Sequence, residues 1–284
     1  MRGWWQDLTD LVLPAECGGC GTPRTVLCRE CRAALTGAAP CRVRPVPEPP
    51  GLPTVHAAAP YADEVRATLL AHKERGALVL AKPLGVALAG AVRAALREVR
   101  EGSGDTGGPA LLVPVPSAPW AVRARGHDPV RRIALAAAGE LRRAGRSARV
   151  APVLRQRRAV ADQSGLDSRQ RLDNLAGALG VVPGGARLLA GGRLVLVDDL
   201  MTTGASLTEA ARAVREAVAY DGGVTVVYAR AAREGRQEQP MDSVKEAREG
   251  AYGTPGMAGT NTAGPTICAG VIAASPDSFE INRN

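Results

Sequence analysis

The sequence predicts an α/β protein in which helices flank a parallel sheet, preceded by a small four-cysteine module. Short apolar runs typical of buried strands alternate with longer amphipathic stretches from residue 54 onward. This alternation favours a parallel sheet with helices on both faces. Two C-x-x-C pairs lie within the first 31 residues, and paired cysteines at this spacing are typical of a small metal-binding module.

The chain of 284 residues is long enough for one domain with an appendage or for two small domains. Changes in composition divide it into five parts. They are an N-terminal helix with the cysteine module (1–43), a proline-rich linker (44–53), the main domain (54–231), a polar insertion expected to be disordered (232–264), and a final strand of the main domain with its tail (265–284).

The elements of the main domain are predicted from their apolar patterns. The helices are expected over residues 68–99, with a break near Gly76, over 128–145 and over 206–218. The strands are expected over residues 110–118, 194–199, 224–230 and 266–274. Each of these strands is strongly apolar, as strands covered on both faces usually are.

The positive charge is concentrated in one part of the chain. The net charge is +8, and residues 121–175, with 13 arginines and five acidic residues, carry all of it. Such a segment suits an anionic ligand, either a small polyphosphate or a nucleic-acid backbone. A solvated helix face would explain part of the same charge.

The longest apolar run, residues 78–96, is interrupted by Lys82, Pro83 and Arg93. It therefore predicts a core helix and not a membrane span. Near the N-terminus, Asp7 and Asp10 interrupt the apolar stretch that a signal peptide would need. We expect a cytoplasmic protein without a membrane-spanning segment.

The two C-x-x-C pairs are formed by Cys17, Cys20, Cys28 and Cys31. Each pair can turn two thiolates toward one tetrahedral ion, so a structural zinc site is the favoured interpretation. Disulfides would require an oxidising compartment, and a redox dithiol would require only one pair. Because all four positions are cysteines, no position is left for a reactive water.

The stretch LVLVDDLMTTGAS, residues 194–206, predicts a ligand site. Asp198 and Asp199 end an apolar strand, at the sheet edge where ligands of such folds bind. The loop after them consists of Thr202, Thr203, Gly204, Ala205 and Ser206. Hydroxyls and free N–H groups at a helix N-terminus bind phosphate, while carboxylates accept hydrogen bonds from ribose hydroxyls. Together they suit a ribose 5-phosphate, although a capping box from Ser206 to Glu209 would explain those two residues.

This stretch closely resembles the motif with which type I phosphoribosyltransferases bind 5-phosphoribosyl 1-pyrophosphate (PRPP). The resemblance implies the fold of that class, with PRPP held as its magnesium complex. It implies catalytic roles for Asp198 and Asp199 on the ribose, and 5-phosphate binding by residues 202–206. The segment LLVPVPSA, with Pro116 and Ser117, and the following Arg125 would contact the pyrophosphate.

A four-cysteine ribbon joined to such a domain is the layout of the ComF family of competence proteins, also called the GntX family. The similar segments are LPAECGGCG, LCREC, YADEVRATLLAHKERG, VPVPSAPWAVRARGHDPV and DQSGLDSRQRLDNLAGAL. The resemblance covers roughly residues 8–230 and the last strand. The chain departs from the family at His127-Asp128, where an aromatic residue and Asn are usual, at the single Cys41, and in the insertion.

The family resemblance implies transfer at the ribose anomeric carbon, with pyrophosphate as leaving group, in a protein associated with DNA uptake. The acceptor is not apparent from the sequence. The alternative is a non-catalytic competence factor that binds DNA or a DNA-uptake protein and uses the PRPP site for sensing. The basic segment fits this alternative, whereas the low aromatic content of 3% does not favour stacking on single strands.

Overall fold

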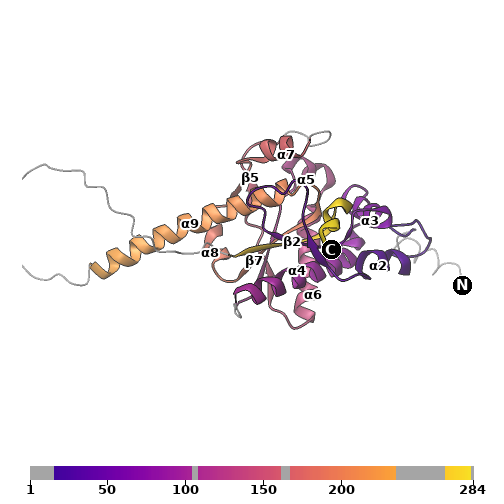
Figure 1. Ribbon diagram of the computed structural model, residues 1–284, viewed down its shortest axis with the longest axis horizontal. Helices are drawn as coiled ribbons and strands as arrows, with labels where there is room; N and C mark the ends of the chain where they lie inside the picture. The colour runs from indigo at the N-terminus through magenta and orange to yellow at the C-terminus, as the bar shows by residue number, and fades with distance from the viewer. Residues whose placement is uncertain (1–15, 104–107, 161–166, 235–265, 283–284) are drawn as a thin grey trace, which may run out of the picture.

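A computed structural model describes residues 16–103, 108–160, 167–234 and 266–282 (Figure 1). Within these residues, one six-stranded sheet has the order β1-β2-β8-β7-β3-β4. Only β1 runs antiparallel to its neighbour; the other paired strands are parallel. The strands are β1 (Cys41–Val43), β2 (Thr54–Pro60), β3 (Ala110–Pro114), β4 (Ala148–Val150), β7 (Arg193–Met201) and β8 (Ile267–Ala274).

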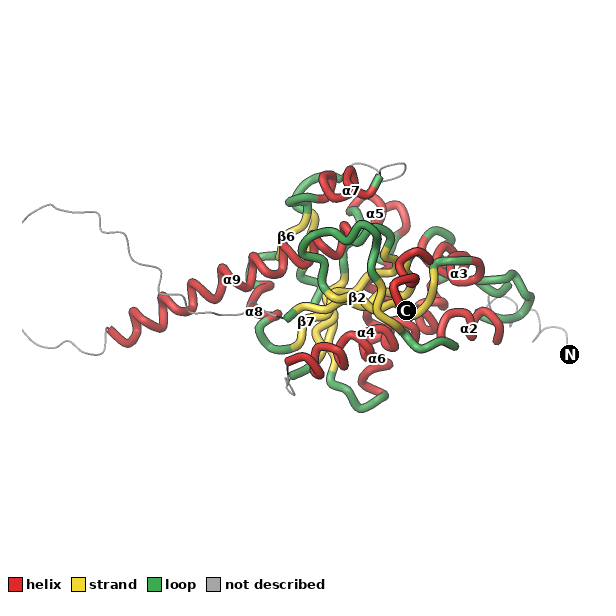
Figure 2. Tube along the Cα trace, in the orientation of Figure 1, coloured by secondary structure: helices red, strands yellow, loops and turns green. Residues whose placement is uncertain are grey.

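Helices cover both faces of this sheet (Figures 1 and 2). On one face, leucines of α4 and Ile133 of α6 pack with Val195 and Val197 of β7. On the other face, Leu207 and Val214 of α9 pack with Leu196. The alternation of β7 side chains between the two clusters explains why the strand is apolar throughout. The helices of these layers are α3 (Asp63–Lys73), α4 (Ala81–Ser103), α6 (Pro129–Arg143) and α9 (Ala205–Glu234).

Smaller elements surround these layers. Strands β5 (Leu154–Gln156) and β6 (Leu179–Val181) form a separate antiparallel pair. The short helices are α2 (Arg29–Thr36), η1 (Leu78–Leu80), α5 (Pro119–Arg125), α7 (Ser168–Leu175), α8 (Gly185–Leu189) and η2 (Pro276–Asn282). The chain is therefore an α/β protein with a mostly parallel central sheet flanked by helices, as the sequence pattern predicts.

One predicted strand is wrong. Residues 224–230 lie within α9, which continues through them to Glu234. A short run rich in valine suits a buried strand or a helix equally well by periodicity alone, and here it continues the helix that precedes it. The predicted N-terminal helix falls largely on residues 1–15, and most of the predicted insertion falls on residues 235–265, all outside the described residues.

Strand β7 is longer than predicted. Asp198 and Leu200 still have strand partners, Val271 and Ala273 of β8. The two aspartates therefore lie within the paired part of β7 and not beyond its end. The strand extends to Met201 because that side chain is buried in the same cluster as α9. This extension fixes the backbone on both sides of the aspartates.

The four-cysteine module shares a core with the main domain. Leu27, Cys31 and Leu35 are buried in one cluster with Leu80 and Leu84. The proline-rich segment that follows lies against the loop after β7, where a side chain at Gly204 would meet Leu52 and Pro45. Both segments therefore contact the sheet domain directly.

Among the described residues, one helix is long and apolar enough to cross a membrane by length and composition. It spans Leu78–Glu101, and 61% of its most apolar window is buried inside the structure. This helix packs against α6 and the central strands. A mostly buried core helix passes the same test, so the indication of a membrane span is weak.

Candidate functional site

The carboxyl ends of β3 and β7 open into a cleft of about 380 Å³. The two ends lie side by side because the Val115 N–H donates to the Val197 carbonyl at 2.9 Å. The cleft brings together seven of the predicted site residues, from three separate stretches of chain. They are Pro116, Ser117, Arg125, Asp198, Asp199, Thr202 and Ser206.

The two aspartates are held close to each other. The Asp199 N–H donates to Oδ1 of Asp198 at 2.8 Å, and Asp199 is only 6% exposed. Burial, and next the charge of Asp199, raise the pKa of Asp198 well above its ordinary value. The pair thus binds a proton more readily than two separate surface acids would.

Lys73 compensates this charge. Its Nζ lies in the cleft wall and donates to Oδ2 of Asp199 at 2.8 Å. Burial alone would lower the pKa of Lys73, but the carboxylate of Asp199 outweighs burial and raises it. Lys73 is therefore charged at neutral pH and forms a half-buried ion pair at the end of β7.

The loop after the aspartates is divided between the cleft and the core. Thr202 and Ser206 line the cleft, whereas Gly204 and Ala205 are buried below them and Thr203 is half-buried. Gly204 has a φ of 75°, a left-handed conformation that favours glycine and allows the tight turn into α9. The N-terminus of this long helix therefore begins at the cleft, a position that suits a phosphate group.

Glu209 does not make the contacts of the capping box that was the alternative explanation. The Glu209 carboxylate does not reach back to the start of the helix. It accepts the Leu179 N–H at 3.0 Å and is paired with Arg212 Nε at 2.7 Å. The alternative explanation of Ser206 as part of a capping box therefore loses its second member, and Ser206 is left lining the cleft.

Arg125, the predicted pyrophosphate ligand, lines the cleft while it is paired with a neighbour. Its Nε and Nη2 donate to the two carboxylate oxygens of Glu74 at 3.0 and 2.8 Å. This two-point ion pair fixes the plane of the guanidinium. Arg125 is therefore oriented by Glu74, the residue that directly follows Lys73 at the end of α3.

The cleft contains residues that sequence analysis did not predict as site residues. They are Lys73, Trp120 and Gln156. Arg171 is not part of the lining, but its Nη1 donates to Oγ1 of the lining residue Thr202 at 3.3 Å. Lys73 lies in the helix segment noted for its family resemblance, which could have indicated it. Trp120 also lies in a segment with family resemblance, VPVPSAPWAVRARGHDPV, whereas Gln156 lies in no motif and only its position in space identifies it.

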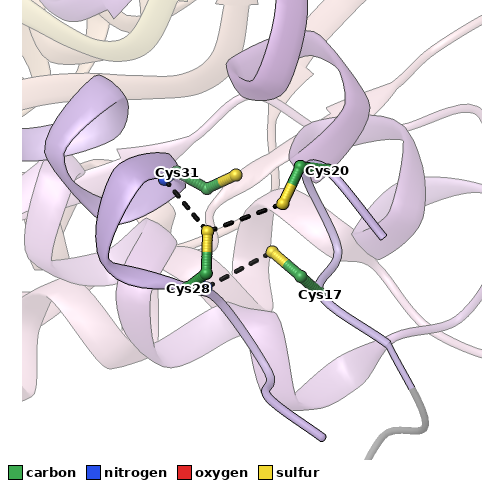
Figure 3. Close-up of side chains that lie close together, drawn as sticks. All are labelled: Cys17, Cys20, Cys28 and Cys31. Carbon is green, nitrogen blue, oxygen red and sulfur yellow. Dashed lines mark hydrogen bonds between the residues drawn. The ribbon is translucent and has the colours of Figure 1, made fainter. Parts of the chain in front are cut away.

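The second candidate site is the cysteine module (Figure 3). The four thiol sulfurs of Cys17, Cys20, Cys28 and Cys31 all lie within 4.8 Å of one another. A tetrahedral zinc ion with Zn–S distances of about 2.3 Å requires sulfurs roughly 3.8 Å apart. Cys20 and Cys28 already meet this condition, with their sulfurs 3.5 Å apart. Cys41 and Cys268 lie outside the cluster.

Backbone N–H groups favour a thiolate in this cluster. Burial opposes ionisation of Cys17, but the N–H groups of Cys28, Cys20 and Gly19 outweigh burial and lower the pKa of Cys17 to about 6. Thr22 lowers the pKa of Cys20 through hydrogen bonds to its sulfur. For Cys31, burial is the largest effect and raises its pKa, and the neighbouring cysteines raise it further. Four sulfurs in this arrangement suit a divalent cation, which would neutralise the thiolates.

Comparison with known proteins does not place the chain in a family. No protein-family model matches it, and no curated protein matches it significantly. Its function is therefore inferred from the cleft and the cysteine cluster themselves.

Proposed function

We propose that this chain is a phosphoribosyltransferase of the type I fold that binds PRPP with magnesium in the cleft at the ends of β3 and β7. One observation carries the proposal: paired acids, hydroxyls at a helix N-terminus and a cation line the same cleft. Paired carboxylates suit the vicinal hydroxyls of a ribose, and a helix N-terminus suits its 5-phosphate.

In this proposal, different residues bind the ribose, the 5-phosphate and the pyrophosphate of PRPP. Asp198 and Asp199 accept hydrogen bonds from the two ribose hydroxyls. Thr202 and Ser206 bind the 5-phosphate with N–H groups of the first turn of α9. The loop after β3, with Ser117, and the guanidinium of Arg125 face the pyrophosphate end. Magnesium, when bound with PRPP, neutralises part of the pyrophosphate charge.

The proposed reaction is a displacement at the anomeric carbon. The bond from C1 to the pyrophosphate oxygen breaks, and its electron pair leaves with pyrophosphate. An amine or nucleobase nitrogen forms the new bond to C1 and releases its proton to solvent. Positive charge develops on the sugar as in glycoside chemistry, and the carboxylates of Asp198 and Asp199 stabilise it.

The test is the paired change Asp198→Asn with Asp199→Asn, measured by calorimetry with Mg-PRPP. Each lost charged hydrogen bond is worth about 1.5–3 kcal/mol, so losing two should lower affinity by roughly a hundredfold to ten-thousandfold. The fold should survive, because removing two adjacent charges relieves their repulsion. Equal affinity in the variant and the wild type would refute the site. A screen of amine and nucleobase acceptors for pyrophosphate release then tests transfer itself.

We also propose that Cys17, Cys20, Cys28 and Cys31 hold one structural zinc ion. The support is the clustering of four sulfurs within 4.8 Å, with cysteine at every position and no place for a reactive water. When bound, zinc supplies cross-linking and not chemistry, joining the loop at residues 17–22 to the start of α2.

The second candidate function is the binding of DNA or of a DNA-uptake protein, as the resemblance to ComF proteins implies. It is favoured by four exposed arginines near the two ends of α6, namely Arg131, Arg132, Arg142 and Arg143. Duplex DNA held by such arginines would be released steeply by salt. Salt-sensitive DNA binding by a wild type that binds no Mg-PRPP would favour this function over the transferase.

A further inference from the structure

Neither the proposed transfer reaction nor the proposed zinc site gives Lys73 a role. It stands in the last turn of α3, 126 residues before the acid that it contacts. Its side chain is about one-third exposed, whereas that of Asp199 is 8% exposed. The lysine is thus partly exposed to solvent, while its partner is almost enclosed.

The aspartate pair needs such a cation. Two ribose hydroxyls require two hydrogen-bond acceptors, and a protonated carboxyl would offer a donor in place of one of them. Burial and the neighbouring acid raise the pKa of Asp198, whereas the positive charge of Lys73 lowers it. Without the lysine, one proton would remain on the pair to higher pH.

We propose that Lys73 is a positioning residue of this site, which keeps both carboxylates available as acceptors by pairing with Asp199. The inference rests on the proposed function, since it concerns how the same cleft binds a ribose. Lys73 acts through Asp199 and not by contacting the sugar, so its effect depends on that aspartate.

Other charged and titratable groups close to Lys73 in the sequence and in the cleft are paired with one another. Glu74 and Arg125 are paired with each other, and the His72 and His127 rings pack against each other with centroids 5.7 Å apart. Lys73, the last residue of α3, contacts Asp199, and its charge also acts on Asp198. Arg125, the last residue of α5, acts on Lys73 and is paired with Glu74, which directly follows α3.

The first experiment measures Mg-PRPP affinity by calorimetry between pH 6.5 and pH 9 for the wild type and Lys73→Gln. The glutamine removes the charge but retains a hydrogen-bond donor. Each unit by which the pKa of the pair rises lowers affinity about tenfold at a pH below that pKa. We therefore expect Lys73→Gln to bind more weakly than the wild type, by about tenfold for each unit by which the pKa rises, and the loss to shrink as the pH rises. Lys73→Arg should restore most of the affinity.

A double-mutant cycle separates positioning from direct contact. In an Asp199→Asn background, Lys73→Gln should change affinity by less than about threefold, because the lysine no longer has a carboxylate to hold. An equal loss in both backgrounds would overturn the inference, since it would mean that Lys73 binds the ligand itself. The double variant also removes both buried charges, so it provides a folded sample if Lys73→Gln alone is unstable.

Lys82→Gln is the matched control, because Lys82 is exposed and does not line the cleft. It should bind Mg-PRPP like the wild type. If the wild type binds no Mg-PRPP, the proposed function fails. The inference is then decided by carbon-13 titration of the Asp198 and Asp199 carboxyls in the free protein. Lys73→Gln should raise their midpoint, and an unchanged midpoint would overturn the inference.

Discussion

Glu209 shows how one charged residue joins a helix to a distant strand. Its side chain is 5% exposed and accepts hydrogen bonds from Leu179 N–H and from two guanidinium nitrogens of Arg212. Burial alone would raise the pKa of Glu209, but the hydrogen bonds from Arg212 and Leu179 outweigh it and lower the pKa. The carboxylate therefore stays ionised and connects α9 with β6.

Glu209→Ala should lower the free energy of unfolding by about 3–5 kcal/mol, because it leaves the Leu179 N–H and part of the Arg212 charge without their buried partner. Urea denaturation at pH 7 measures this change. Glu216→Ala is the matched control. Glu216 pairs with the same Arg212 from the next turn of α9 after that arginine, but the Glu216 side chain is 60% exposed. The control should cost less than about 1 kcal/mol, and equal losses would show that burial does not decide the contribution.

Single residues of the site were predictable only where they formed a motif. The stretch from Asp198 to Ser206 is continuous, so the sequence alone indicated which residues share the loop. Lys73 lies far away along the chain, and only the packing of α3 against the end of β7 brings it to Asp199. Glu209 fits the spacing of a capping box, but the strand contact that it makes instead depends on a tertiary neighbour.

At the scale of elements, α3 joins the two candidate sites. Its Val65 and Leu69 share a core with Leu27 and Cys31 of the cysteine module. It ends at Lys73, which is paired with Asp199, and Glu74 directly after it is paired with Arg125. One helix of 11 residues therefore contacts both the cysteine module and the cleft.

Elemental analysis should find about one zinc ion per chain, and Cys20→Ser should abolish it. Loss of the metal loosens the module against which α3 packs. Backbone amides of α3 should then exchange at least about tenfold faster, or ~1.4 kcal/mol, while those of α6 change little.

Cys41→Ser is the control for this experiment. Cys41 is a β1 residue outside the cluster of sulfurs. It should retain the zinc and the slow exchange of α3. A full zinc content in Cys20→Ser would contradict the proposed ligand set.

Elements were predictable where length and pattern agreed. The strands at residues 110–118 and 194–199 and the helix at 128–145 appear close to their predicted places. Strand β2 was missed because its sequence, TVHAAAP, has three alanines and a final proline and only two β-branched residues, Thr54 and Val55. The run at 224–230 has those residues and is helical, since intrinsic strand preference is weak without pairing partners.

At the scale of the whole molecule, the position of β8 in the strand order makes the sheet continuous. Strand β8 pairs with β2 on one side and with β7 on the other. All eight of its residues are buried. Without it, β1 and β2 would have no hydrogen bonds to β7, β3 and β4. A chain ended after residue 264 is expected to lack a cooperative thermal transition, whereas ending the chain after residue 282 should preserve it. Calorimetry of the two truncations tests this prediction.

The central place of β8 also sets an order of events during synthesis. A ribosome that has completed β7 must add 65 further residues, 202–266, before β8 begins. At about 5–20 residues per second, the nascent chain waits roughly 3–13 seconds with an open edge on β7. Exposed strand edges recruit other strands, including those of neighbouring nascent chains. The protein should therefore depend on chaperones during translation more than its size suggests, and its yield should fall when translation is slowed within residues 202–266.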